Sequence, residues 1–131
     1  MPEITRAKTL HQGQFSRLIK ITQGTSRYPE RDVLVLMLGH HCGMRITEIS
    51  RLTVADVMHA SGKLRNEISM REAITKGCRQ RCAYLASKPA IQALESYLQY
   101  RIERCIGIVL GPGPYRRLLP HQPLIYSGRG D

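Results

Sequence analysis

The sequence contains no long apolar run, no internal repeat and no low-complexity tract. Its longest unbroken apolar stretch, Val33 to Gly39, is far shorter than the roughly 20 residues that span a membrane. The N-terminal stretch MPEITRAKTL has no apolar core of a secretory signal. We therefore expect a cytoplasmic protein without membrane contact. Its 131 residues, of which 42% are apolar, suffice for one domain that buries a core.

The sequence also lacks cysteines and histidines at the spacing that metal ligands need. The four cysteines are Cys42, Cys78, Cys82 and Cys105, and no CxxC pair occurs. On a strand, Cys78 and Cys82 would lie roughly 13 Å apart, too far for two ligands of one tetrahedral zinc. Adjacent helical residues such as His40 and His41 point in different directions and chelate poorly. We expect no metal and no cofactor, and reduced thiols fit a cytosolic chain better than disulfides.

Acidic residues are scarce. Ten Asp and Glu face 20 Lys and Arg, which gives a net charge of +10 and a pI near 10.0. The excess is spread along the whole chain, so it indicates a folded cationic surface rather than a basic tail. Nucleic acid is the partner that such a surface favours. An anionic membrane is a weaker alternative, because no expected helix combines a strong apolar face with a lysine-rich one. The charge is also compatible with a basic protein of unrelated function.

Apolar residues recur at helical spacing in four segments, which we expect to be helices over about 9–24, 29–41, 44–52 and 87–104. Pro29 suits the first turn of the second helix, and Gly43 suits its end. The apolar run that follows Pro29 could also be a buried strand, but the acidic, proline-led start favours a buried central helix. In the third segment, Ile46, Ile49 and Leu52 share one helical face.

Between the third and fourth helices the pattern changes to an imperfect alternation. Residues Ile68, Met70 and Ile74 fit one strand, and 79–85 fits a returning strand after the break Thr75-Lys76-Gly77-Cys78. The sequence predicts an α+β fold that is mainly α-helical, with helices packed around a small antiparallel sheet of two or three strands. After the last helix, Gly and Pro indicate loops, and Leu124-Ile125-Tyr126 is a candidate short strand or buried anchor.

This order of elements resembles the first part of the catalytic domain of the tyrosine recombinase (phage integrase) family. The segment Cys42–Leu52, CGMRITEISRL, is similar to the family segment that carries the first catalytic arginine. The segment Thr75–Arg81, TKGCRQR, is similar to the hairpin that carries the catalytic lysine. Thr9–Asp32 and Pro123–Gly130 are also similar to family segments, so the resemblance covers nearly the whole chain.

The resemblance implies cleavage of DNA by a tyrosine that forms a 3'-phosphotyrosine and releases a 5'-hydroxyl. Arg45 would clamp the nonbridging phosphate oxygens, Lys76 would protonate the leaving oxygen, and Glu48 would support the basic groups. Without the resemblance, Arg45 and Glu48 could form a surface ion pair, and Lys76 could be a solvated turn lysine. The residues expected to contact DNA are Thr75, Arg79 and Arg81.

Two family features are missing from the sequence. No HxxR box follows Pro123, because His121 is followed by Gln-Pro-Leu. The nucleophilic tyrosine should lie beyond residue 131, so Tyr126 is not assigned this role. We expect residues 1–131 to be a single partial catalytic domain, inactive alone, without the core-binding domain and the C-terminal catalytic half. Double-stranded DNA is the expected partner, with self-association or docking onto a full-length recombinase as further partners. The alternative is a noncatalytic module that binds nucleic acid or modulates a recombinase.

Overall fold

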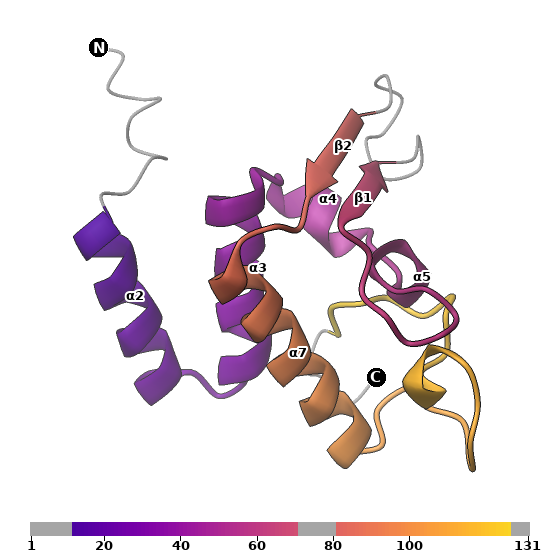
Figure 1. The fold of residues 1–131 in the computed structure, drawn as a ribbon. Helices are drawn as coiled ribbons and strands as arrows, with labels where there is room; N and C mark the ends of the chain where they lie inside the picture. Colours follow the sequence, from indigo (N-terminus) through magenta and orange to yellow (C-terminus); the bar gives the residue numbers. More distant parts are fainter. Residues whose placement is uncertain (1–11, 71–80, 127–131) are drawn as a thin grey trace.

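The computed structural model describes residues 12–70 and 81–126. It has the predicted α+β, mainly helical fold, with one small antiparallel sheet that lies at one edge of the helical part (Figure 1). Within the described ranges no helix is long and apolar enough to cross a membrane. The elements are α2 (Gln12–Thr25), α3 (Pro29–Cys42), α4 (Ile46–Ser50), α5 (Val54–Val57), β1 (Glu67–Met70), β2 (Arg81–Tyr84), α7 (Lys88–Glu103) and the 3-10 helix η1 (Tyr115–Arg117).

Helix α3 is the centre of the fold and packs against both α2 and α7 (Figure 1). The α-helical backbone of Pro29–Cys42 confirms the predicted central helix over the alternative of a strand, and Leu34 and Leu38 on it are completely buried. Gly43 ends the helix in the left-handed conformation, with φ 70°, and its N–H donates to the carbonyl of Leu38. Glycine adopts this conformation without the clash that a Cβ atom would cause.

The segment after Gly43 differs from its prediction, because the helix expected over 44–52 spans only Ile46–Ser50. Arg45 has extended backbone, with ψ 155°, and is the N-cap residue rather than part of the helix. Ile49 is buried as predicted, but the side chain of Ile46 is 66% exposed. The expected apolar stripe therefore begins one turn late. The short helix α5 follows and was not predicted as a helix.

The sheet has two strands in the part of the chain that the structure describes. Strands β1 and β2 are antiparallel, with Glu67 opposite Tyr84 and Met70 opposite Arg81. Ile68 and Ala83 face the core, being 0% and 3% exposed. The predicted returning strand is thus confirmed. The predicted turn at 75–78 lies outside the described residues.

The C-terminal segment packs against residues that are distant from it in the sequence. Leu124 is completely buried, and its N–H donates to the carbonyl of Leu52 over 2.8 Å. The N–H of Val54 donates to the carbonyl of Gln122 over 3.2 Å, and Thr53 and Pro123 form a β-bridge. The predicted buried anchor at 124–126 is confirmed at Leu124.

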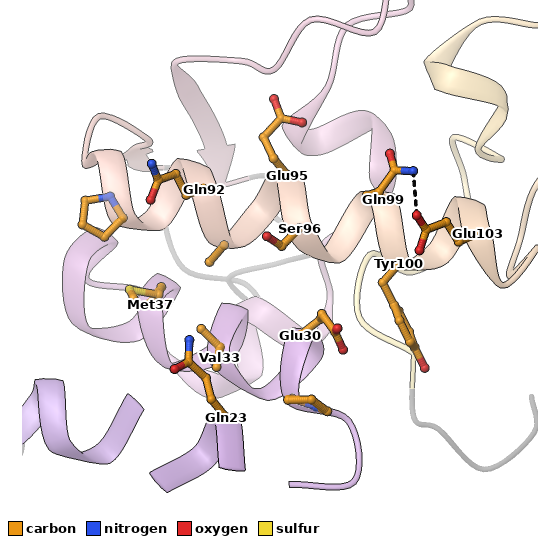
Figure 2. Close-up of a pocket in the computed structure, with 13 residues that line it drawn as sticks. Gln23, Glu30, Val33, Met37, Gln92, Glu95, Ser96, Gln99, Tyr100 and Glu103 are labelled. Carbon is orange, nitrogen blue, oxygen red and sulfur yellow. Dashed lines mark hydrogen bonds between the residues drawn. The ribbon is translucent and has the colours of Figure 1, made fainter. Parts of the chain in front are cut away.

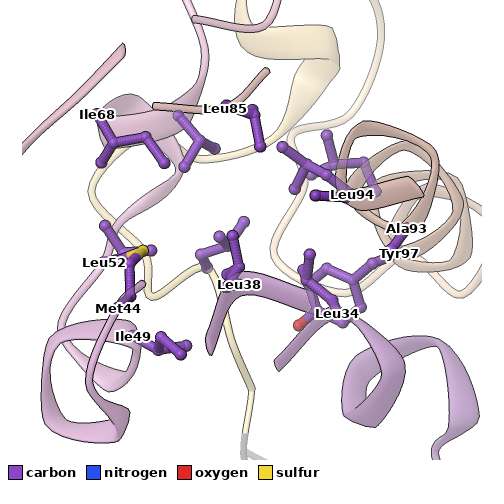
Figure 3. Packing of buried hydrophobic residues seen from close by; sticks show 14 of the residues in the cluster. Leu34, Leu38, Met44, Ile49, Leu52, Ile68, Leu85, Ala93, Leu94 and Tyr97 are labelled. Carbon is purple, nitrogen blue, oxygen red and sulfur yellow. The ribbon is translucent and has the colours of Figure 1, made fainter. Parts of the chain in front are cut away.

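A single hydrophobic cluster joins these elements (Figure 3). Leu34 and Leu38 of α3 meet Leu94 of α7 on one side. On the other side lie Ile68 of β1, Leu52, and Met44, which precedes α4 (Figure 3). The strand pair and the segment of Arg45 are therefore fixed to the same part of the core.

Candidate functional site

Arg45 is exposed, and its place on the molecule is set by the residues beside it. Met44 is buried in the core with only 5% exposure, whereas the side chain of Arg45 lies in solvent. No carboxylate among the described residues forms an ion pair with Arg45. Its guanidinium is thus presented at the surface from a backbone that is held by the core.

Glu48 holds that backbone. Its side chain is only 3% exposed, and Oε1 accepts a hydrogen bond of 2.8 Å from the backbone N–H of Arg45. A carboxylate in the first turn also interacts favourably with the positive end of α4. The structure therefore places Arg45 and Glu48 together through the backbone, and the alternative of a surface ion pair between their side chains is wrong.

Removal of this carboxylate should destabilise the protein. Glu48→Ala is expected to lower the free energy of unfolding by about 1–2 kcal/mol, because the backbone N–H of Arg45 at the start of α4 loses its acceptor. Glu48→Gln keeps an acceptor oxygen and is expected to lose less. Urea denaturation followed by circular dichroism measures both changes, and an unchanged stability of Glu48→Ala would contradict the capping role.

The hairpin residues predicted for the site are described only in part. Lys76, Thr75 and Arg79 lie outside the described residues. Arg81 is the first residue of β2, opposite Met70, and only its backbone position is described. The convergence of Lys76 with Arg45, and the DNA contacts of the hairpin, therefore stay predictions.

His40 and His41, weighed above as metal ligands, join helices instead. The ring of His40 stacks on Phe15 of α2 with 3.9 Å between the ring centroids. Nδ1 of His41 lies 3.2 Å from the hydroxyl oxygen of Ser87, just before α7. Over residues 12–70 and 81–126 no group of three or more His, Cys, Asp or Glu gathers at metal-binding distance. Burial lowers the pKa of His41 below its ordinary value, and the neighbouring His40 lowers it further.

This lowered pKa predicts a loss of stability in mild acid. The folded state binds the proton of His41 less readily than the unfolded chain, so stability is full above the ordinary pKa near 6.5. It falls as the pH drops from that value through the lower pKa of the folded state. Between pH 7.5 and 5, the melting temperature of His41→Gln should fall by less than that of the parent protein. His59→Gln, in an exposed turn, is the control and should follow the parent curve.

A buried arginine was not found from the sequence, which identified only the amphipathic character of α7. Arg101 is completely buried, and its guanidinium donates to the carbonyls of Ile106, Pro123 and Leu124 over 3.0–3.2 Å. It also lies over the ring of Tyr126, 4.4 Å from the centroid. Burial lowers the pKa of this guanidinium. Arg101 therefore fastens the C-terminal segment to α7.

Tyr97 and Tyr126 belong to the same cluster. The hydroxyl oxygen of Tyr97 accepts a hydrogen bond of 3.1 Å from the backbone N–H of Tyr126, and burial raises the pKa of Tyr97. The carbonyl of Tyr126 accepts from Arg31 over 3.2 Å. Tyr97 thus has a packing role.

Cationic side chains are exposed on several elements. Within the described part of the chain, the exposed ones are Arg17, Lys20, Arg27, Arg45, Lys63, Lys88 and Arg104. Because they come from both halves of the chain, the charge excess lies on a folded surface and not on a tail. Such a surface attracts polyanions without reading a sequence.

Comparison with known families identifies the class of this protein. The model of the phage integrase family matches residues 8–110. The match covers most of the chain, so the chain belongs to the phage integrase family, as the resemblance predicted. Membership supports a recombinase-like function and an interaction with DNA in general. No curated protein and no solved structure matches the chain.

Proposed function

We propose that this chain is a DNA-binding protein of site-specific recombination, with the phosphate-clamping arginine of the phosphotyrosine mechanism at Arg45. The observation that carries the proposal is the exposed guanidinium of Arg45 on a backbone fixed by the buried Glu48, within the family match. A planar guanidinium donates two parallel hydrogen bonds to phosphate oxygens, which a lysine cannot do.

The chemistry assigns a different role to Lys76. When a tyrosine oxygen attacks the phosphorus, negative charge grows on the nonbridging oxygens, and Arg45 would stabilise it. The bond to the 5' oxygen then breaks, and that oxygen takes the proton that Lys76 would donate. A lysine has an ordinary pKa near 10.4, so useful acidity requires cations nearby. Arg79 and Arg81 are the neighbours in sequence that would supply them.

Residues 1–131 contain no HxxR box. In this proposal the chain is a single partial catalytic domain, because its residues supply Arg45 and Lys76 but not the second arginine or the nucleophile. It therefore binds double-stranded DNA and does not cut it alone. The second candidate is a noncatalytic module that coats DNA or modulates a recombinase, a role that the exposed cations of the described residues would also serve. It differs in requiring no role for Lys76.

Binding to a DNA duplex should weaken steeply with salt. If about four phosphates are neutralised, affinity falls on the order of a hundredfold between 50 and 200 mM salt, because counterions are released on binding. Fluorescence anisotropy of a labelled duplex measures this slope. Arg45→Ala is expected to weaken binding at each salt concentration and to reduce the slope by about one, as loss of one phosphate contact does. Arg104→Ala is the matched control, because it removes one exposed cation at the end of α7, and it is expected to weaken binding less than Arg45→Ala.

Affinity that does not change with salt would remove the DNA-binding proposal. A nicked suicide substrate tests the catalytic part, since it traps a covalent protein–DNA adduct. No adduct is expected from residues 1–131, and an adduct would overturn the proposed inactivity. Lys76→Ala should weaken binding if the hairpin reaches DNA, whereas an unchanged affinity would favour the noncatalytic module.

A further inference from the structure

A groove of about 850 Å³ lies between α3 and α7, with the end of α2 at its edge (Figure 2). The two long helices run in opposite directions along it. As a result, Glu30 near the start of α3 and Glu103 at the end of α7 lie toward one end of the groove, whereas Met37 of α3 lies toward the other end (Figure 2). The groove thus has an acidic end and an apolar end.

The acidic end has charge that the described residues leave largely uncompensated. Glu30 forms no ion pair among them, and Glu103 accepts one hydrogen bond, of 3.1 Å, from the amide of Gln99. Glu103 is also the last residue of α7, where the helix carbonyls add negative potential. Glu95, farther along the groove, is already paired with Arg116. The guanidinium of Arg104, which lies 5.2 Å from the ring centroid of Tyr100 at this end, forms an ion pair with neither Glu30 nor Glu103, so both carboxylates stay available to the cations of a partner.

A matching cationic and apolar surface is present on α2. Phe15 and Ile19 are the residues of α2 that are buried. Arg17, Lys20 and Ile21 lie on the opposite side of the helix at i, i+3 and i+4, and the side chain of Ile21 is 52% exposed. This outer face of α2 combines two cations with one apolar side chain within about one turn.

We propose that the groove receives the outer face of α2 from a second copy of this chain, in a twofold dimer. Arg17 and Lys20 of one copy then meet Glu30 and Glu103 of the other, and Ile21, which lies within the same turn, packs against Val33, one turn from Glu30 in the groove. The arrangement is reciprocal because Gln23 places α2 at the edge of its own groove, so two copies that face each other fill both grooves at once.

The net charge sets the conditions under which the dimer forms. Two copies of charge +10 repel each other at long range, but at about 0.15 M salt charges are screened beyond about 8 Å. Pairs in direct contact across the groove are screened much less. The dimer does not require DNA, so its test is separate from that of the proposed function.

Sedimentation equilibrium at this salt concentration tests the proposal. The parent protein is expected to dimerise reversibly with concentration. The double variant Arg17→Glu with Lys20→Glu should weaken dimerisation at least tenfold, because each contact occurs twice and becomes repulsive. Glu30→Lys with Glu103→Lys should weaken it similarly, and the combination of all four reversals should restore it.

Two charge reversals outside both surfaces, Lys63→Glu and Glu67→Lys, are the controls and should leave the dimer unchanged. Thermal unfolding of each variant establishes that it is folded, and duplex binding is measured in parallel. A parent protein that stays monomeric, a dimer indifferent to the reversals, or a fourfold variant that fails to recover would each overturn the proposal. DNA binding retained by a monomeric Glu30→Lys, Glu103→Lys variant would show that the two proposals stand separately.

Discussion

Replacement of Arg101 by alanine is expected to lower the free energy of unfolding by about 3–5 kcal/mol. The substitution leaves three backbone carbonyls, those of Ile106, Pro123 and Leu124, without their donor and opens a cavity under Tyr126. The charge itself is tolerated in this interior because Arg101 lies in the last turn of α7, at the negative end of the helix.

Denaturant unfolding monitored by circular dichroism measures this loss. Arg101→Lys keeps the charge but has a shorter, nonplanar donor group, so it should recover only part of the stability. Arg101→Met fills the volume but leaves the carbonyls unpaired, so it should recover less than lysine. Arg104→Ala, exposed one turn later, is the control and should change stability by less than about 0.5 kcal/mol. A stability of Arg101→Ala equal to that of Arg104→Ala would contradict the fastening role.

Gly107→Ala is expected to lower the free energy of unfolding by about 2–4 kcal/mol. Gly107 has φ +67°, which strains any residue with a Cβ atom. An added Cβ would also overlap the guanidinium of Arg101 and lie 2.6 Å from the hydroxyl oxygen of Tyr126. Both side chains are held by other contacts, so neither can move aside freely.

A second glycine separates these two effects. Gly111 has a similar φ of +79°, but nothing lies within 4 Å of the position that its Cβ would take. For Gly111→Ala the free energy of unfolding should therefore fall by only about 1 kcal/mol, the cost of holding alanine at a positive φ. Thermal or urea unfolding of the two variants side by side measures the difference. Equal losses would show that the space around Arg101 is not closely packed.

The sequence predicted the elements whose patterns are local. Helix α3 was identified from Pro29 at its start and Gly43 at its end, because both residues act through their own backbone geometry. The family was identified from Cys42–Leu52, where the arginine and its apolar neighbours stand at a characteristic spacing. The returning strand, predicted over 79–85 and observed as Arg81–Tyr84, was found from the hairpin-like break at 75–78 that precedes it.

The features that depend on distant contacts were not predicted. The extended backbone at Arg45 follows from the capping bond to Glu48, and helical spacing alone gives no sign of it. Burial of Arg101 depends on carbonyls more than 20 residues away in sequence, at Pro123 and Leu124. Arg101 does follow Leu98 by three residues, and this spacing places the arginine on the apolar side of α7. An arginine on that side is the one local signal that could have indicated the contact.

The pairing of residues 52–55 with 120–124 also bears on synthesis of the protein. Leu124 contributes to the core, so the core cannot close until that residue has left the ribosome. Until then, a nascent chain that already contains α2, α3 and α7 exposes the apolar side chains that Leu124 and its neighbours later cover. Premature termination before Leu124 would therefore yield a product that chaperones and proteases recognise.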